Sequence, residues 1–199
     1  MRTERLPADE PDRGDAILAE LNDLAGAVRS ARRGEASGWD TLFERFHPDV
    51  HAYALARLGD WSGAEDVTQE VFVAAVTSIR RLRDEREPAV QAWFLHICRH
   101  KVIDHLRRNL RQRRLPVDEP EPASDPQHVV EARLRADELR AALSKLTEDQ
   151  RDILVRRFVL DHSIDEVASA TGRSAGAVKS LQHRALATLG RLFAGRQAS

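Results

Sequence analysis

Apolar residues recur every three or four positions along most of the 199-residue chain, which predicts helices rather than strands. The clearest pattern lies in residues 163–193. Ser163 followed by Glu166 forms a capping-box signature, and Gly172 supplies the left-handed conformation that ends a short helix. Ser174 is expected to cap a second helix with a single apolar stripe, which consists of Val178, Leu181, Ala185, Leu189 and Leu192.

The other side of this second helix is polar and basic, and it carries Lys179, Ser180, His183, Arg184 and Arg191. Two helices joined by a turn with glycine, the second with a small polar start and a basic outer face, are typical of a helix-turn-helix. A simple αα-hairpin would show the same apolar pattern. The turn chemistry and the basic face favour the helix-turn-helix.

Helices are also expected in the first half of the chain. Asp15 can cap a helix that ends near Arg33. The next helix is predicted to start near Trp39 and to be interrupted at Pro48, because proline removes a backbone hydrogen bond. Its apolar positions predict a buried face that includes Tyr53.

Two further helices follow in the pattern. Ser62 and Glu65 resemble a capping box for a helix that runs from Ala64 to about residue 79. A charged connector over residues 80–88 separates it from a long helix, expected from residue 89 to about residue 108. The first half of the chain therefore reads as a helical bundle.

A segment rich in proline and acidic residues divides the chain. Residues 115–128 hold four prolines and few apolar groups, so we expect an extended linker there. The expected organisation is a mobile tail over residues 1–14, a helical domain over residues 15–114, the linker, and a second helical domain over residues 129–199. In the second domain, Thr147 and Gln150 form another capping-box signature.

Composition excludes several classes of protein. The net charge of −1 gives no overall basic field, so nucleic-acid binding would need charge segregated along the chain. Such segregation is present, because acidic residues dominate the linker while arginine is crowded over residues 99–114. The single cysteine, Cys98, excludes an internal disulfide and fits a reducing compartment. With no apolar run of membrane-spanning length and a polar start, we expect a cytoplasmic protein.

The helix that begins near residue 64 has an acidic side. Glu65, Asp66, Gln69 and Glu70 all fall off its apolar stripe. A solvated surface is the common role of such residues, and a docking surface for a basic partner is the alternative. The physical pattern alone favours the solvated surface.

The long helix over residues 91–108 mixes aromatic and basic residues. Trp93 and Phe94 are interleaved with histidine, lysine and arginine, a mixture that suits single-stranded nucleic acid because rings stack on bases and cations hold phosphates. The alternative places the aromatic rings in the core and the basic groups on the surface. For Trp93 the two interpretations are equally weighted.

Metal and catalytic sites are disfavoured. Two histidine pairs have the i, i+4 spacing that can chelate zinc, namely His47 with His51 and His96 with His100. Neither pair has the glutamate of an H-E-x-x-H motif or an evident third ligand. Cys98 lies among apolar residues and is expected in the core. With no glycine-rich phosphate loop, we expect no cofactor, no metal and no catalytic residue.

Five segments in order carry a resemblance to a known family. Residues 39–46, 64–72 (AEDVTQEVF) and 92–99 resemble a bacterial RNA polymerase sigma factor of the extracytoplasmic-function (ECF) type, in the sigma-70 family. Residues 146–151 and 175–185 resemble the second sigma domain. The resemblance implies an all-α fold of two helical domains. It also implies a subunit that binds core RNA polymerase and directs it to promoters.

The resemblance implies roles residue by residue. The acidic helix would bind the clamp helices of the largest polymerase subunit, through Asp66, Gln69 and Glu70. The long helix and the connector before it would open the minus-10 element and hold a flipped base, through Arg80, Arg83, Trp93, His100, Lys101, Asp104, Arg107 and Arg108. The helix-turn-helix would read the minus-35 element, through Gly176, Ala177, Lys179, Ser180, His183 and Arg184.

Two positions depart from the family pattern. His100 stands where the family usually has asparagine, and Leu181 stands where a basic residue is frequent. The partners implied are core RNA polymerase, promoter DNA and an anti-sigma factor, with no membrane insertion. A stand-alone helix-turn-helix regulator is the alternative, and it predicts tight duplex binding without polymerase. A metal-dependent helical enzyme is a more distant alternative, because it needs a bound metal.

Overall fold

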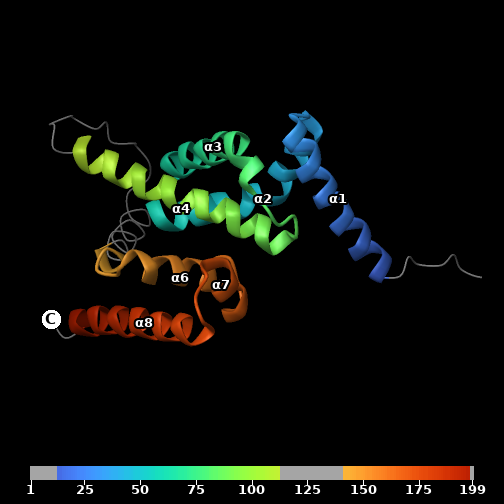
Figure 1. Ribbon diagram of the computed structural model, residues 1–199. Coiled ribbons are helices and arrows are strands. Elements are labelled where there is room, and N and C mark those ends of the chain that lie inside the picture. The colour runs from blue at the N-terminus through green and yellow to red at the C-terminus, as the bar shows by residue number, and fades with distance from the viewer. Residues whose placement is uncertain (1–12, 113–140, 198–199) are drawn as a thin grey trace, which may run out of the picture.

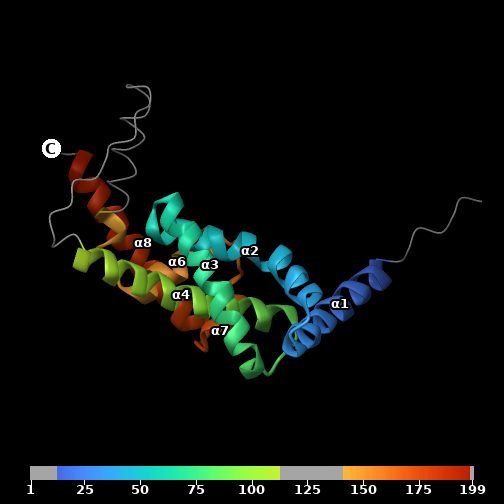
Figure 2. The same ribbon diagram turned by 90° about the horizontal axis from the view of Figure 1, so that it is seen from above.

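The computed structural model describes residues 13–112 and 141–197, and these residues form helices and turns without strands. Figures 1 and 2 show two groups of helices packed together. The first group consists of α1 (Arg13–Arg33), α2 (Ala36–Leu58), α3 (Trp61–Ser78), the 3₁₀ turn η1 (Ile79–Arg81) and α4 (Glu87–Gln112). The second group consists of α6 (Glu148–Phe158), α7 (Ile164–Thr171) and α8 (Ala175–Gln197). The expected all-α fold is confirmed.

The core of the first group lies where α2, α3 and α4 meet. Its largest fully buried side chains include Phe46, Tyr53 and Phe94. The rings of Phe46 and Phe94 are stacked, with centroids 5.2 Å apart. Each such burial contributes about 1.5–3 kcal/mol, so this core accounts for much of the stability of the bundle. Cys98 is also fully buried, and burial raises the pKa of its thiol to about 12, as expected of a core residue.

Helix α1 crosses α2 at a small residue. Gly38 is buried, and a Cβ atom there would lie 2.5 Å from both the Ala27 carbonyl oxygen and the Ala31 nitrogen. Glycine therefore permits the two backbones to approach closely at this point. Leu24 and Val28 on α1 are buried against the same core. This crossing fixes the last two turns of α1 on the bundle.

The second group has two small apolar clusters. One joins Leu146, Leu154 and Ala185, and the other joins Ile153, Val167 and Val178. Leu181 packs against the second cluster, so it belongs to the core stripe as the spacing predicts. In Figure 1, α6 and α7 lie between α8 and α4, which leaves one side of α8 facing away from the first group.

Local capping signals are confirmed in the second group and wrong at one site in the first. Thr147 and Ser163 each form a complete capping box, with Gln150 and Glu166 respectively. At α3, however, the N-cap is Asp60, whose carboxylate accepts a hydrogen bond from the Gly63 nitrogen at 3.0 Å. The helix therefore starts at Trp61, and the proposed box of Ser62 and Glu65 does not form.

The predicted boundaries of three helices also need correction. Helix α1 begins at Arg13, so Asp15 lies inside the helix instead of capping it. Helix α2 starts at Ala36 and continues through Pro48. The neighbouring residues of its buried face, Phe46 and Val50, are almost fully buried, so packing maintains the helix despite the lost hydrogen bond. Helix α4 is longer than expected at both ends.

Several predictions lie outside the described residues. They are the first 12 residues of the tail expected over residues 1–14, the linker over residues 115–128, and the start of the second domain, residues 129–140. Within the part of the chain that the structure describes, none of the helices is long and apolar enough to cross a membrane.

Candidate nucleic-acid and protein interfaces

The turn between α7 and α8 has the geometry of a helix-turn-helix. Gly172 ends α7 with a φ of 66°, a left-handed conformation that glycine adopts without steric cost. The Ser174 hydroxyl then accepts a hydrogen bond from the Ala177 nitrogen at 3.2 Å, which caps α8. Both features follow from local sequence, and both predictions are confirmed.

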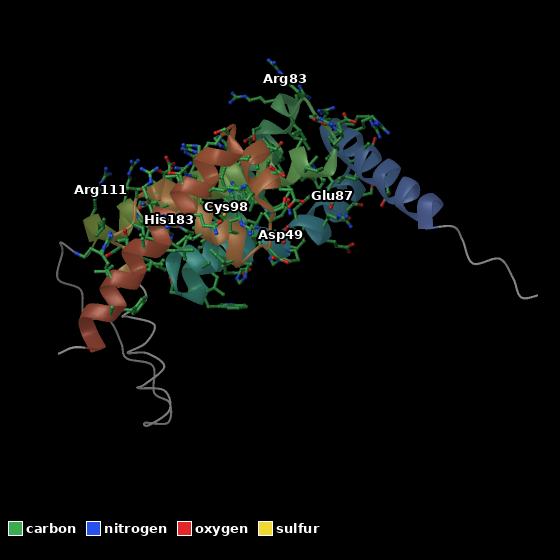
Figure 3. All side chains as sticks on the ribbon, turned by 90° about the horizontal axis from the view of Figure 1, so that it is seen from below. Asp49, Arg83, Glu87, Cys98, Arg111 and His183 are labelled. Atoms are coloured by element: carbon green, nitrogen blue, oxygen red, sulfur yellow. The ribbon has the colours of Figure 1, made fainter. Side chains whose placement is uncertain are left out.

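Helix α8 presents a basic side to solvent. Val178 and Ala185 are fully buried, while these residues on the other side of the helix are exposed: Gly176, Lys179, Ser180, His183 and Arg184. Ala177 is half-buried. The sequence of α8 contains no acidic residue, so the positive charge of this side is not offset within the helix. Figure 3 shows His183 on this surface.

The acidic side of α3 splits into two environments. Asp66 and Gln69 are exposed. Glu70 is only one-third exposed and forms ion pairs with two basic residues of α4, Arg108 at 2.8 Å and Lys101 at 3.4 Å. Burial tends to raise the pKa of Glu70, but these two cations outweigh it, and the net pKa is lowered. Glu70 is therefore a negative charge shared between α3 and α4.

A groove of about 550 Å³ runs between α3 and α4. It is lined by Asp66, Gln69, Glu70, Val73, Lys101, His105, Arg108 and Asn109. The residues expected to bind polymerase and two of those expected to bind minus-10 DNA thus share one groove. The sequence placed them on separate helices and gave no sign that they pair.

The remaining minus-10 candidates are spread along α4 and its connector. Trp93 is half-buried, and its ring packs against the core of the first group, edge-on to Phe94 with centroids 4.9 Å apart. His100 is exposed, and Asp104 and Arg107 are paired at 3.8 Å. Arg80 in η1 and Arg83 in the connector that follows it are exposed, and Figure 3 shows Arg83 directed away from the bundle.

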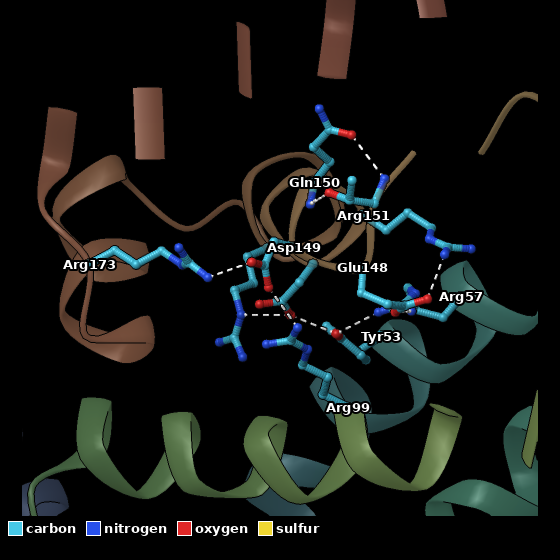
Figure 4. A network of polar contacts seen from close by, with 11 residues as sticks. Tyr53, Arg57, Arg99, Glu148, Asp149, Gln150, Arg151 and Arg173 are labelled. Atoms are coloured by element: carbon cyan, nitrogen blue, oxygen red, sulfur yellow. Dashed lines mark hydrogen bonds and ion pairs between the residues drawn. The ribbon is translucent and has the colours of Figure 1, made fainter. Parts of the chain in front are cut away.

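A polar network that the sequence did not reveal joins the two helical groups (Figure 4). The Tyr53 hydroxyl of α2 donates a hydrogen bond of 2.6 Å to Asp152 of α6. Asp152 also accepts one from Arg156 at 3.1 Å, and both side chains are less than 5% exposed. Burial and the neighbouring Asp152 charge raise the pKa of Tyr53, so its hydroxyl keeps its proton and remains a donor.

Ion pairs surround this buried centre. The Arg57 guanidinium of α2 binds Glu148 and also donates to the Tyr53 hydroxyl at 3.0 Å. The Asp149 carboxylate pairs with Arg99 of α4 at 2.7 Å and with Arg173 at 2.6 Å. Apart from the contact between Arg57 and Tyr53, which are four positions apart, these contacts link residues distant in sequence. The network holds α6 against α2 and α4, in a closed arrangement of the two groups.

Metal ligands do not gather in the part of the chain with described side chains, where no group of three potential ligands occurs. The rings of His47 and His51 stack with centroids 5.8 Å apart, and those of His96 and His100 lie 4.6 Å apart. Each histidine pair is therefore a contact between two rings on one helix, and no third ligand from the described residues joins either pair.

The fold and the exposed basic side of α8 define a helical DNA-binding protein of the helix-turn-helix class. Comparison with known families makes this more specific. Residues 42–112 match the family model of Sigma-70 region 2, and residues 136–189 match that of Sigma-70, region 4. The ECF RNA polymerase sigma factor SigD of Mycobacterium tuberculosis is 36% identical over 174 residues, which cover 83% of this chain and 82% of SigD. The chain belongs to the ECF sigma factors of the sigma-70 family.

Solved structures share the fold. CnrH, solved in complex with the cytosolic domain of CnrY, superimposes with a TM-score of 0.62 and 24% identity, over 87% of this chain and 98% of that one. RpoE of Bartonella quintana, solved with the anti-sigma factor NepR, gives a TM-score of 0.54 and 22% identity, over 77% of this chain and 95% of that one. Sigma factors are not enzymes, and the stand-alone regulator is not favoured.

Proposed function

We propose that this sigma factor docks on core RNA polymerase through the acidic side of α3 and reads promoters with two separate surfaces. Asp66, Gln69 and Glu70 would contact the clamp helices of the largest subunit. The connector and α4 would capture unpaired bases of the minus-10 element, and α8 would enter the major groove at minus-35. This proposal is supported most by the match of both sigma regions in order, together with exposed basic residues on α8 that no acidic residue of the helix offsets.

The closed arrangement bears on how the two surfaces could act together. The minus-10 and minus-35 promoter elements are about 25 base pairs apart, or about 85 Å at roughly 3.4 Å per base pair. Packed helices lie about 8–10 Å apart. Because α8 is two layers from α4, these two helices are much closer together than the two promoter elements. The segment 113–140 could span at most roughly 95 Å at about 3.4 Å per residue. We propose that the two groups separate when the chain binds core polymerase, so that both surfaces can reach one promoter.

An anti-sigma factor is the proposed regulator. RpoE of Bartonella quintana, which has the same fold, was solved bound to one. A partner that covers Asp66 to Glu70, or that holds the two groups closed, would block polymerase docking. Because the proposed partner is core RNA polymerase, we place the activity in the cytoplasm.

The minus-35 role predicts a specific loss. Replacing Lys179 and Arg184 together by alanine should lower initiation at least tenfold at a promoter with both elements, since each lost contact costs about 1–3 kcal/mol. Run-off transcription with saturating core polymerase measures it. Arg191→Ala is the matched control, because Arg191 is exposed on the same helix and hydrogen-bonds Thr188 at 3.2 Å. An equal loss in the control, or no loss in the double variant, would contradict the assignment.

A further inference from the structure

The connector between η1 and α4 is held from outside by α1. The Arg32 guanidinium donates to both the Leu82 carbonyl oxygen and the Glu85 carboxylate. Arg29, one turn earlier on α1, pairs with the other oxygen of Glu85 at 3.2 Å. The side chains of Arg32 and Glu85 are about three-quarters buried, with 27% and 26% exposed. A guanidinium that binds a backbone carbonyl and a carboxylate at once fixes the loop in two places.

Both ends of the connector are also anchored to the first group, at Leu82 and at Glu87. Leu82 is buried in the core of the first group, and its nitrogen donates to the Ile79 carbonyl at 3.1 Å. Glu87, at the start of α4, pairs with Arg45 of α2 at 2.6 Å. Between these anchors, Asp84 accepts a hydrogen bond of 3.0 Å from the Arg86 nitrogen. The loop is therefore braced by α1 and α2 and has a defined turn, while Arg83 remains exposed.

Helix α1 is itself rigidly mounted where Arg32 emerges. The contact at Gly38 locks its last turns onto α2, and Val28 and Ala31 are almost fully buried. Arg32 therefore extends to the connector from a fixed base. This helix lies outside the matched region 2, which begins at residue 42.

We propose that Arg32, assisted by Arg29, is a positioning residue for promoter reading, which holds residues 82–86 in the conformation that receives one unpaired minus-10 base. The inference rests on the proposed function, because it assumes that this connector contacts DNA. Arg32 itself touches no base. Its loss should leave polymerase docking on α3 intact and should loosen only the loop.

The test measures base selectivity with holoenzyme assembled from the full chain and core RNA polymerase. The probe is single-stranded DNA with a randomised block, and bound sequences are read by sequencing. Wild type should enrich a minus-10-like sequence. Arg32→Ala should flatten the preference at one base position about tenfold, and Glu85→Gln, which keeps the side-chain shape, should flatten the same position about threefold. Affinity for core polymerase should stay unchanged in both variants.

Arg33→Ala is the matched control, because Arg33 is adjacent, 60% exposed, and pairs with Glu35 instead of the connector. A merely structural role for Arg32 would lower core affinity or enrichment at every position, and that outcome would overturn the inference. Wild-type selectivity in both Arg32→Ala and Glu85→Gln would also overturn it. If Arg32→Ala fails to fold, Glu85→Gln decides alone. If wild-type holoenzyme enriches no sequence, the proposed function itself fails, and the inference falls with it.

Discussion

Replacing Asp152 by alanine is expected to break the closed arrangement of the two helical groups. Asp152 accepts hydrogen bonds from Tyr53 and Arg156, and its removal leaves the Arg156 guanidinium, only 3% exposed, without this buried counter-charge. Breaking a buried pair in this way costs about 3–5 kcal/mol. The separated form avoids that cost, because water can then solvate Arg156. We therefore expect opening of the chain, seen as an increased radius of gyration in X-ray scattering.

Tyr53→Phe is the matched control for this prediction. It removes the hydrogen bond that the hydroxyl donates to Asp152 and the one that it accepts from Arg57. Arg57 keeps its pair with Glu148, and the buried pair between Asp152 and Arg156 stays in place, so no buried charge loses its counter-charge. It should therefore open the chain less than Asp152→Ala does. If both variants scatter as compactly as wild type, the network does not hold the groups together.

Asp152→Ala should lower the stability of the fold but strengthen binding to core polymerase. If only the separated form can engage core polymerase fully, the measured affinity is the affinity of that form multiplied by the fraction of molecules that are separated. Asp152→Ala should then bind core polymerase several-fold more tightly although its free energy of unfolding is lower. A lower core affinity would contradict the requirement for opening.

Asp66→Arg is expected to abolish most binding to core polymerase. Asp66 is exposed at the groove between α3 and α4, so charge reversal there should turn attraction to a basic partner surface into repulsion without disturbing the fold. We expect a loss of at least tenfold in affinity, measured by titrating labelled chain with core polymerase. Glu44→Arg is the control, because Glu44 is equally an exposed acid but lies on α2. Unchanged core affinity in Asp66→Arg would contradict the assignment.

Glu70 would be a poorer choice for this test. Its removal would delete an acidic contact and at the same time release Lys101 and Arg108, which pair with it. Because both cations are proposed to contact minus-10 DNA, a Glu70 variant would change two proposed surfaces together. An Asp66 variant changes only the surface proposed to bind polymerase.

The features that sequence predicted correctly are local ones. The capping boxes at Thr147 and Ser163 and the turn at Gly172 each depend on residues within four positions of one another, so the local sequence predicts them. The cap of α3 was mispredicted because Asp60, two residues before the expected Ser62, takes the N-cap position. Its carboxylate accepts a hydrogen bond from the Gly63 nitrogen, and the helix starts at Trp61.

The features that sequence missed depend on contacts between distant residues. Tyr53 and Asp152 are separated by 99 positions, and nothing near either residue signals the other. Tyr53 was correctly expected on a buried face, yet its hydroxyl partner came from another helical group. The pairing of Glu70 with Arg108 was missed for the same reason, since α3 and α4 each read as an independent surface.

As an ECF sigma factor, this chain is expected to give core RNA polymerase promoter specificity. Run-off transcription on fragmented genomic DNA from the organism that encodes the chain, with 5′ ends sequenced, tests it most directly. With the chain added, start sites should gather at a small set of positions preceded by two shared elements about 25 base pairs apart, and Asp66→Arg should abolish the pattern. Start sites that are the same with and without the chain would contradict the claim.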